Sequence, residues 1–190
     1  DLSKDANSGK AVNEENTKNW YIIPFLKALG YDRRDISAEE PIQYKGDKRL
    51  DLYISVDGTP VMLVECKKRG ININDPKVVK QLSGYFYEKV AKDNVELAVL
   101  TNGDDYIFFT DSVKPNVMDE EPYFSIRLLE MKYGEITELL NRYSKEEITS
   151  LDFIEDVKEQ KIRRESKSIA EGLVNGKIPN YLIQSVADRV

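Results

Sequence analysis

The chain of 190 residues contains no histidine and a single cysteine, Cys66. Without histidine it cannot build a Ser-His-Asp triad, a Cys-His dyad or a histidine zinc site. One cysteine makes neither an internal disulfide nor a cysteine zinc site, and it fits a reducing cytosol, so we expect a cytoplasmic protein. Any chemistry therefore falls to carboxylates, Lys, Tyr, Ser or a hard metal ion.

The chain also lacks long apolar runs, and its net charge is not positive. No stretch approaches the roughly 18 apolar residues that a membrane span needs, and no N-terminal segment resembles a secretion signal, so we expect no membrane partner. The formal net charge is −6, from 28 Lys+Arg and 34 Asp+Glu. Charge alone does not suggest DNA as a ligand, so any nucleic-acid surface must be local.

The order of predicted elements is helix, strands, helix, strands, helices, which is typical of a small α/β domain. We expect a flexible lead-in over 1–11, a domain over 12–130 and a helical C-terminal extension over 131–190. Pro24 is a point where the first helix could kink. The patterns predict helices at 12–29 and 76–92, strands at 49–56, 61–67, 95–101, 106–110 and 123–129, and a charged connection at 31–47 with a short strand at 42–44.

The most informative segment is 48–68, KRLDLYISVDGTPVMLVECKK, which reads as two strands joined by an Asp-Gly turn. Side chains alternate along a strand, so Glu65 and Lys67 point the same way, and Asp51 lies on the strand before. Among four E-x-K patterns, only this one ends a buried strand behind a strand with an inward acid. Such a set can hold Mg²⁺ beside a phosphodiester, with Asp51 and Glu65 as ligands and Lys67 contacting the scissile phosphate or the attacking water.

Blander interpretations remain open for these residues and for their neighbours. Asp51 and Lys67 could form a cross-strand ion pair. Gln81 and Tyr85 lie one turn apart on the next helix, so either Gln81 orients Lys67 or a DNA phosphate, or Tyr85 is core and Gln81 is exposed. Cys66 alternates away from the acid and the lysine that flank it, which indicates a core residue rather than a nucleophile.

Glu14 and Glu15 open the first helix behind Asn13, a predicted N-cap. Either both are first-turn acids that the helix dipole favours, or one of them completes the acidic cluster. Basic side chains lie along the same segment as the acids, and they are either a local DNA-binding surface or scattered solvated charge. These side chains are Lys45, Lys48, Arg49, Lys67, Lys68, Arg69, Lys77 and Lys80.

Taken in order, these residues resemble the PD-(D/E)xK nuclease superfamily: an acid in the first helix, Asp51, Glu65-x-Lys67 and Gln81-x-x-x-Tyr85. More narrowly, four segments look like the N-terminal nuclease domain of type I restriction enzyme R subunits and of related short restriction-like proteins. The segments are NEENTKNWYIIPFLKALGYD, LVECKK, QLSGYF and AVLTNGDDYIFFTD. The resemblance covers residues 12 to about 130, which would then be the nuclease-like domain.

The resemblance implies a restriction-endonuclease-like core, with a central mixed β-sheet flanked by helices. It also implies a Mg²⁺-dependent DNA endonuclease of a restriction or phage-defence system, with Mn²⁺ as a substitute ion. Asp51 and Glu65 would be the metal ligands and Lys67 the catalytic lysine, with Gln81 and Tyr85 beside them. The implied partners are DNA and the motor, methyltransferase or specificity subunits of a restriction-modification assembly.

Two other functions stay open: a non-catalytic DNA- or partner-binding module that kept the fold, and a C-terminal tail that mediates a homodimer. The chain also departs from the family pattern. Leu50 stands where the superfamily's name places Pro, and R subunits continue into a helicase motor. No GxxxxGK[ST] phosphate loop occurs here, so we expect a stand-alone relative or an excised domain and attribute no DNA translocation to it.

Overall fold

The computed structural model describes residues 13–41, 49–93, 95, 97–111 and 116–150, and scattered positions between 153 and 174. The expected lead-in over 1–11 and the expected strand at 42–44 lie outside these residues. The chain divides into one compact unit over Asp1–Ser150 and a second over Leu151–Val190. In the part that is described, no helix is long and apolar enough to cross a membrane.

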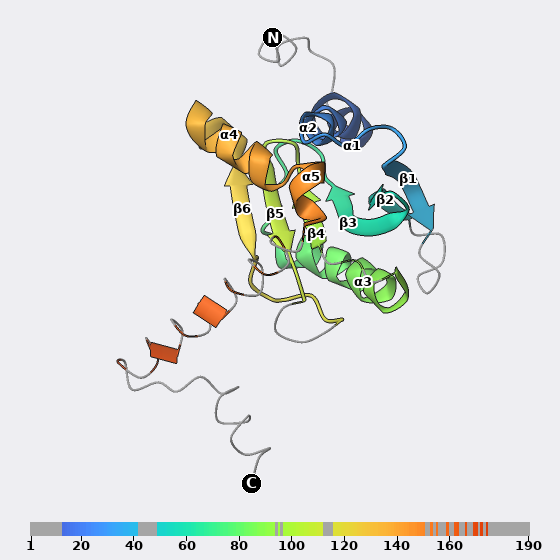
Figure 1. Cartoon of the computed structure of the whole chain (residues 1–190). Coiled ribbons are helices and arrows are strands. Elements are labelled where there is room, and N and C mark those ends of the chain that lie inside the picture. Colours follow the sequence, from blue (N-terminus) through green and yellow to red (C-terminus); the bar gives the residue numbers. More distant parts are fainter. Residues whose placement is uncertain are drawn as a thin grey trace. The chain divides into compact units, whose positions relative to one another are not determined.

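A six-stranded mixed sheet forms the centre of the first unit, in the order β1-β2-β3-β4-β5-β6 (Figure 1). Its strands are β1 (Ile36–Pro41), β2 (Arg49–Val56), β3 (Thr59–Cys66), β4 (Leu97–Thr101), β5 (Asp105–Phe109) and β6 (Phe124–Arg127). β3 and β4 are connected through helix α3 (Pro76–Asp93) and pair parallel to each other. All other neighbouring strands of the sheet pair antiparallel. The expected α/β fold with a mixed sheet flanked by helices is confirmed.

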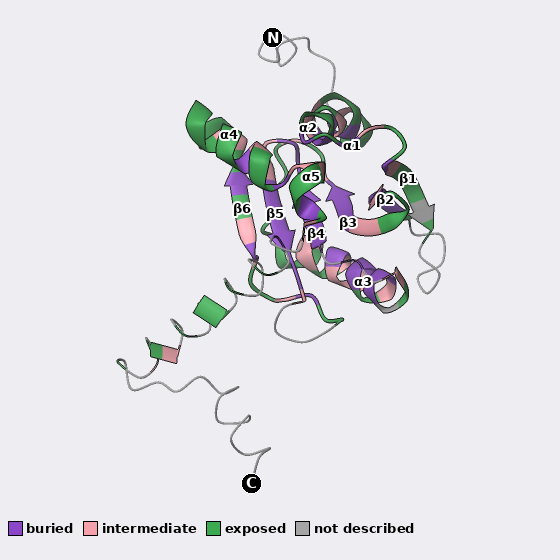
Figure 2. Ribbon diagram, viewed as in Figure 1, coloured by how far each residue is buried: buried purple, intermediate pink, exposed green. Residues whose placement is uncertain are grey.

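Helices cover the sheet on two sides, and its middle strands are buried (Figure 2). On one side α3 places Leu82 and Phe86 in a core cluster with sheet residues such as Leu63 and Leu100. Aromatic contacts mark the other side. The ring of Phe25 lies 4.4 Å from that of Tyr106, and Tyr143 stacks on Phe108 at 4.8 Å.

The first helix begins where the sequence predicts but is not uniform. It runs through α1 (Glu14–Thr17), a π-helical turn η2 (Lys18–Ile22) and α2 (Ile23–Ala28). Asn13 is its N-cap, because Oδ1 accepts a 2.7 Å hydrogen bond from the N–H of Asn16. The helix stops at Gly30, whose φ of 92° lies in the left-handed region that glycine adopts at low cost.

The sequence patterns did not predict strand β1, and they predicted helical structure after β6 without the bounds of the single helices. β1 pairs with β2 from Ile36↔Ile54 to Pro41↔Arg49, although its sequence ISAEEP has weak strand propensity; as an edge strand it can keep polar residues in solvent. After β6 come a 3₁₀ turn, η4 (Leu128–Glu130), then α4 (Tyr133–Arg142) and α5 (Lys145–Ile148). The start of the expected helical extension thus carries the helices α4 and α5.

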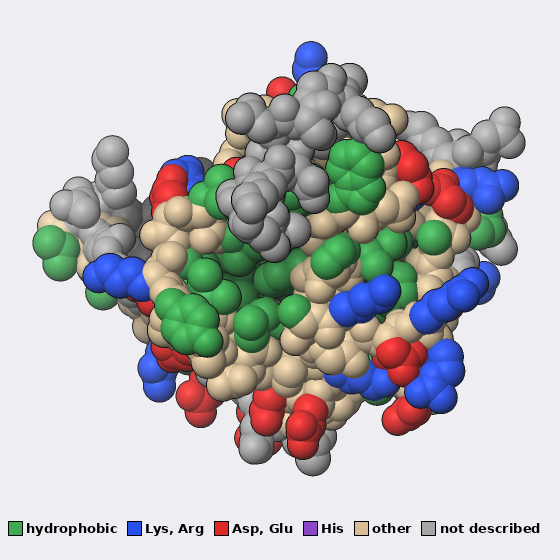
Figure 3. Space-filling model, turned by 90° about the horizontal axis from the view of Figure 1, so that it is seen from above, with side chains coloured by type: hydrophobic (Ala, Val, Ile, Leu, Met, Phe, Trp, Pro, Cys, Tyr) green, Lys and Arg blue, Asp and Glu red, His purple; other side chains and the backbone are tan. Residues whose placement is uncertain are grey.

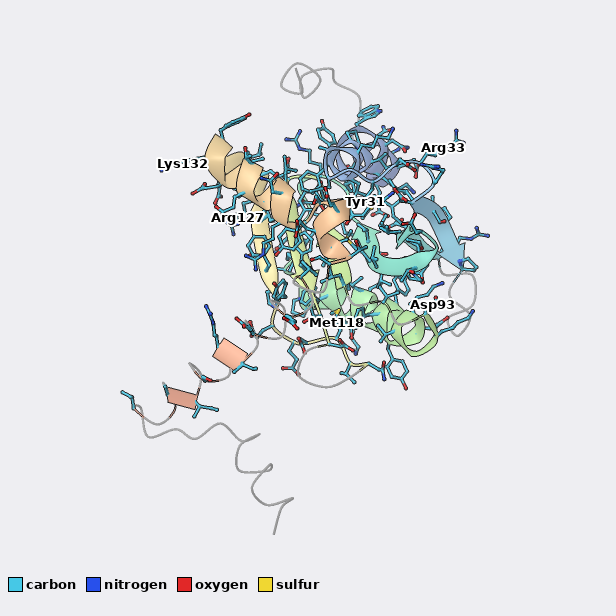
Figure 4. The ribbon with its side chains drawn as sticks, in the orientation of Figure 1. Tyr31, Arg33, Asp93, Met118, Arg127 and Lys132 are labelled. Carbon is cyan, nitrogen blue, oxygen red and sulfur yellow. The ribbon has the colours of Figure 1, made fainter. Side chains whose placement is uncertain are left out.

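Two contacts join these helices to the segment between the first helix and β1. Lys145 at the start of α5 contacts both carboxylate oxygens of the buried Asp35 at 2.8 Å. Tyr31, labelled in Figure 4, donates from its hydroxyl to the carbonyl of Tyr143 at 3.4 Å. α4 and α5 therefore brace the chain that leads from the first helix into β1.

The exposed side chains offer one useful reporter. Figure 3 shows the face seen from above, where hydrophobic side chains gather near the middle and Lys and Arg side chains lie around the rim, more of them on the right. Large hydrophobic residues exposed in the described part include Trp20, Ile71, Leu129 and Tyr133. Trp20 is the only tryptophan of the chain and is 40% exposed, so its fluorescence reports on the first helix.

Candidate active site

The hairpin of β2 and β3 brings Asp51 and Glu65 together. The pair Leu52↔Val64 sets the register, so one step further along the strands Asp51 lies opposite Glu65. Side chains at opposite positions of an antiparallel pair share a face. The backbone also holds Asp51 there, because its Oδ2 accepts a 2.8 Å hydrogen bond from the N–H of Cys66. The two acids singled out in the sequence are therefore neighbours.

Glu65 is the buried centre of the site, with 2% of its surface exposed. Its Oε1 accepts hydrogen bonds of 2.7 Å from Nζ of Lys67 and 2.7 Å from Nε2 of Gln81. Among the described residues, the ion pair of Lys67 is this one rather than a cross-strand pair with Asp51. Oε2 of Glu65 is buried and has no hydrogen-bond partner within the described part of the chain. A buried carboxylate oxygen left without a partner is costly and calls for an explanation such as a ligand.

Burial and neighbouring charges shift the pKa values of Asp51, Glu65 and Lys67. Burial raises the pKa of Glu65 to about 7, the charge of Asp51 adds to the rise, and the bond from Lys67 offsets part of it. Burial also raises the pKa of Asp51, against the hydrogen bond from the Cys66 amide. Burial is the largest single effect on the pKa of Lys67 and lowers it, but the hydrogen bond to Glu65 and the nearby negative charges together outweigh burial and raise the pKa. A further cation between the acids would relieve the repulsion between them.

Helix α3 supplies Gln81 and Tyr85, which project together as their helical spacing predicts. Nε2 of Gln81 donates to the hydroxyl of Tyr85 at 2.9 Å as well as to Glu65, and Oε1 of Gln81 accepts from Lys67 at 3.4 Å. Tyr85 is buried, and Gln81 is half-buried rather than exposed. Gln81 therefore orients both members of the ion pair, and Tyr85 orients Gln81.

The two acids that open the first helix differ in their interactions. The charge of Glu14 contributes to raising the pKa of Asp51 and of Glu65. Glu15 instead bonds along its own helix: Oε1 accepts from Nδ2 of Asn19 at 2.8 Å, and Oε2 lies 2.8 Å from Nζ of Lys18. Bonding to Lys18 and then to Asn19 lowers the pKa of Glu15.

The predicted DNA-binding side chains differ in what they contact. Lys48 lies outside the described residues, while Arg49 and Lys68 are exposed near the site. Arg69 has partners within the protein: its Nε lies 2.7 Å from Oδ2 of Asp104, and its guanidinium packs on the ring of Tyr21 at 4.9 Å. Arg69 thus holds the loop after β3, whereas the exposed Arg49 donates from Nη1 to the backbone carbonyl of Glu39 at 3.4 Å.

Lys18 is the residue that the sequence patterns missed. Its side chain is 6% exposed, and its ammonium contacts Glu15 and Glu39, the latter at 2.9 Å. The contact with Glu39 joins the first helix to the edge strand β1, and local spacing holds no signal for a pairing across 21 positions. Cys66, by contrast, is a buried core residue as predicted, and burial raises the pKa of its thiol.

The residues present fit a hard divalent ion. In the described part of the chain no group of three or more Asp, Glu, Cys or His side chains is placed to hold a metal. Mg²⁺ needs fewer, because it commonly binds one or two carboxylates and takes its remaining oxygens from water and substrate phosphate. The free oxygen of Glu65 and the adjacent Asp51 meet that requirement.

A family model described as Type I restriction enzyme R protein N terminus (HSDR_N) matches residues 13–122. The chain belongs to this family. A solved fragment designated an HsdR subunit of a type I restriction enzyme from Vibrio vulnificus YJ016 is similar over 55% of this chain, with 22% identity and a TM-score of 0.43. The match covers 22% of that chain, so the protein here spans a small part of its length. No curated protein matches the chain significantly.

The region matched by the R protein N-terminal family contains every side chain of the site. It begins at Asn13, the cap of the first helix, and ends before β6. It therefore includes the hairpin acids, the lysine, the Gln81–Tyr85 pair and the first-helix acids. α4 and α5 lie beyond it, so the family match does not bear on these two C-terminal helices.

Proposed function

We propose that this chain is the nuclease domain of a type I-like restriction system and hydrolyses phosphodiester bonds of DNA with Mg²⁺. The observation that carries the proposal is the buried Glu65, whose Oε2 lacks a partner while Asp51 lies opposite and Lys67 contacts Oε1. Membership of the R protein N-terminal family supports the restriction context. Two carboxylates and an ammonium at one spot are what metal-assisted phosphate hydrolysis requires.

Each side chain would have a distinct task. Asp51 and the free oxygen of Glu65 would hold the ion, and Mn²⁺ would replace Mg²⁺ there. When bound, the ion stabilises charge on the phosphate and makes water easier to deprotonate. Lys67 would donate to the scissile phosphate or orient the attacking water, since its ammonium is already held at this spot. Gln81 keeps the ion pair aligned, and Tyr85 keeps Gln81 aligned.

Cleavage of DNA by the purified protein tests this proposal. Supercoiled plasmid should be nicked or linearised with Mg²⁺ or Mn²⁺, and Asp51→Ala or Lys67→Ala should abolish cutting. Glu130→Ala is the matched control, because Glu130 starts another E-x-K pattern but is exposed on η4. Full activity in both site variants would refute the assignment.

A non-catalytic DNA- or partner-binding module is the second candidate. It is favoured by one observation, that Oε1 of Glu65 is already occupied by Lys67 and Gln81, which leaves few open ligand atoms. Calorimetric titration separates the two functions. Binding of Mg²⁺ in the millimolar range in the presence of DNA, lost in Asp51→Ala, supports the nuclease. DNA binding without any metal binding supports the module.

The expected partners follow from the same reasoning. DNA would lie over the exposed Arg49 and Lys68, and cleavage specificity would come from the motor, methyltransferase or specificity subunits of a restriction assembly. A homodimer would allow cutting of both strands. Light scattering behind size exclusion should then give twice the mass of 21.8 kDa, whereas a monomer mass counts against self-association.

A further inference from the structure

Three unusual local features meet around Lys18. The first helix widens into a π-turn over Lys18–Ile22. Glu39 in β1 has a φ of 57°, a left-handed conformation that non-glycine residues seldom adopt. The ammonium of Lys18 is almost fully buried between Glu39, at 2.9 Å, and Glu15, at 2.8 Å. A strained backbone and a buried charge are each costly, and here both belong to one contact between the helix and the edge strand.

Pro24 explains the π-turn. Proline has no N–H, so the α-helical bond to the carbonyl of Trp20 cannot form, and the preceding turn widens. The N–H of Ile23 bonds instead to the carbonyl of Lys18, five residues back. Thr17, the last residue of α1, and Lys18, the first of the π-turn, are both buried.

The helix is anchored on both sides of this turn. Oγ1 of Thr17 accepts a 3.1 Å hydrogen bond from the N–H of Arg69, in the loop after β3. A side chain at Gly103, in the turn after β4, would come within 3.0 Å of Tyr21 and 3.2 Å of Thr17. The helix therefore rests directly on two loops of the sheet, while Lys18 holds it to β1.

The contact with β1 reaches the proposed metal site. The pairs Ala38↔Leu52 and Glu40↔Leu50 flank one position on each strand, so Glu39 lies opposite Asp51. The ammonium of Lys18 binds the carboxylate of Glu39 at this position of the edge strand. Lys18 is also close enough to Asp51 for its charge to lower the pKa of that carboxyl, against the larger effect of burial.

We propose that Lys18 is a positioning residue of the nuclease site: by clasping Glu39 it holds the start of the first helix so that Glu14 faces Asp51 and Glu65. Glu14 lies four residues before Lys18, and its carbonyl accepts the N–H of Lys18, so a shift of one moves the other. This inference rests on the proposed function. It assigns roles to a lysine and an edge-strand acid outside the hairpin motif.

Two variants and a matched control test the ion pair between Lys18 and Glu39, which we call the clasp. Lys18→Met keeps the aliphatic stem and removes the ammonium, and Glu39→Gln removes the other charge at an exposed position. Lys27→Met is the control, because Lys27 is exposed on α2 of the same helix. We expect both clasp variants to fold, to lower kcat by about tenfold to a hundredfold with little change of KM, and to leave the control at wild-type activity.

A double-mutant cycle with Glu14→Gln shows whether Lys18 acts through Glu14. If it does, Glu14→Gln and Lys18→Met together should cost about as much kcat as either alone, whereas a purely structural Lys18 gives additive losses. Full activity of folded Lys18→Met and Glu39→Gln, or additive losses, would overturn the proposal.

A fluorescence measurement that needs neither metal nor DNA tests the clasp independently of the proposed function. Acrylamide quenching of Trp20, the sole tryptophan, should rise in both clasp variants and stay unchanged in Lys27→Met. If the wild type cuts no DNA, the proposed function fails, and the quenching still reports on the clasp. Unchanged quenching in both Lys18→Met and Glu39→Gln would then overturn the clasp as well.

Discussion

The substitution Glu65→Gln should make stability less dependent on pH. The pKa of Glu65 is raised from 4.5 to about 7, first by burial and then by Asp51. Because the folded value lies above the unfolded one, the folded state keeps a proton that the unfolded chain has released. This contribution to stability is complete below about pH 4.5 and is lost as the pH rises through about 7.

The size of the effect follows from the gap between the two pKa values. At about 1.4 kcal/mol for each pH unit, ionising Glu65 costs the fold roughly 3 kcal/mol, of which about 2.5 kcal/mol falls between about pH 5 and pH 8. Gln has the shape of the protonated acid but does not titrate. Lys67 loses its partner in the variant at both pH values, so that loss cancels in the comparison.

Urea unfolding without divalent ions, at about pH 5 and pH 8, measures the effect. Relative to Glu65→Gln, the wild type should lose about 2 to 3 kcal/mol between the two conditions. Glu130→Gln is the control, since its side chain is 67% exposed, and it should follow the wild type within about 0.5 kcal/mol. Equal pH dependence in the wild type and in Glu65→Gln would refute the idea that burial and repulsion strain this carboxylate.

Three further predictions concern metal binding, packing and orientation. Millimolar Mn²⁺ should raise the midpoint of thermal unfolding of the wild type and not of Asp51→Ala; an equal rise in both would place the ion elsewhere. Gly103→Ala should cost about 2 kcal/mol more than Gly58→Ala in urea unfolding, because both have φ above 80° but only Gly103 touches the first helix; equal costs would contradict that packing. Gln81→Leu should lower kcat more than Tyr85→Phe, since Gln81 contacts both members of the ion pair; the reverse order would contradict its orienting role.

Local sequence patterns predicted much of the fold. Alternation along 49–56 and the Asp-Gly turn predicted the hairpin, and it forms as β2 and β3. The cap at Asn13 and the stop at Gly30 bounded the first helix, and its Pro24 left a π-turn rather than a break. Strand β1 was not predicted, because an edge strand of polar residues is chosen by its partner and not by its own propensity.

The sequence likewise predicted one part of the candidate site, and only the fold shows the other. Glu65 and Lys67 are two positions apart on one strand, and Gln81 and Tyr85 one turn apart on one helix, so spacing alone placed each pair on a common face. Spacing could not show that Gln81 bonds to Glu65, but the crossover from β3 to β4 through α3 brings them within 2.7 Å. That bond joins the two pairs into one site.

The sequence by itself determined which residues form the hairpin, which acids and lysine face one side of it, and which family they resemble. Only the tertiary structure shows that Glu15 bonds to Lys18 and Asn19, that Asp104 engages Arg69, and that Lys18 crosses to Glu39. The reason is one of range. Side-chain periodicity acts over a few residues, whereas the last two of these contacts depend on where the helix and the loops come to rest on the sheet.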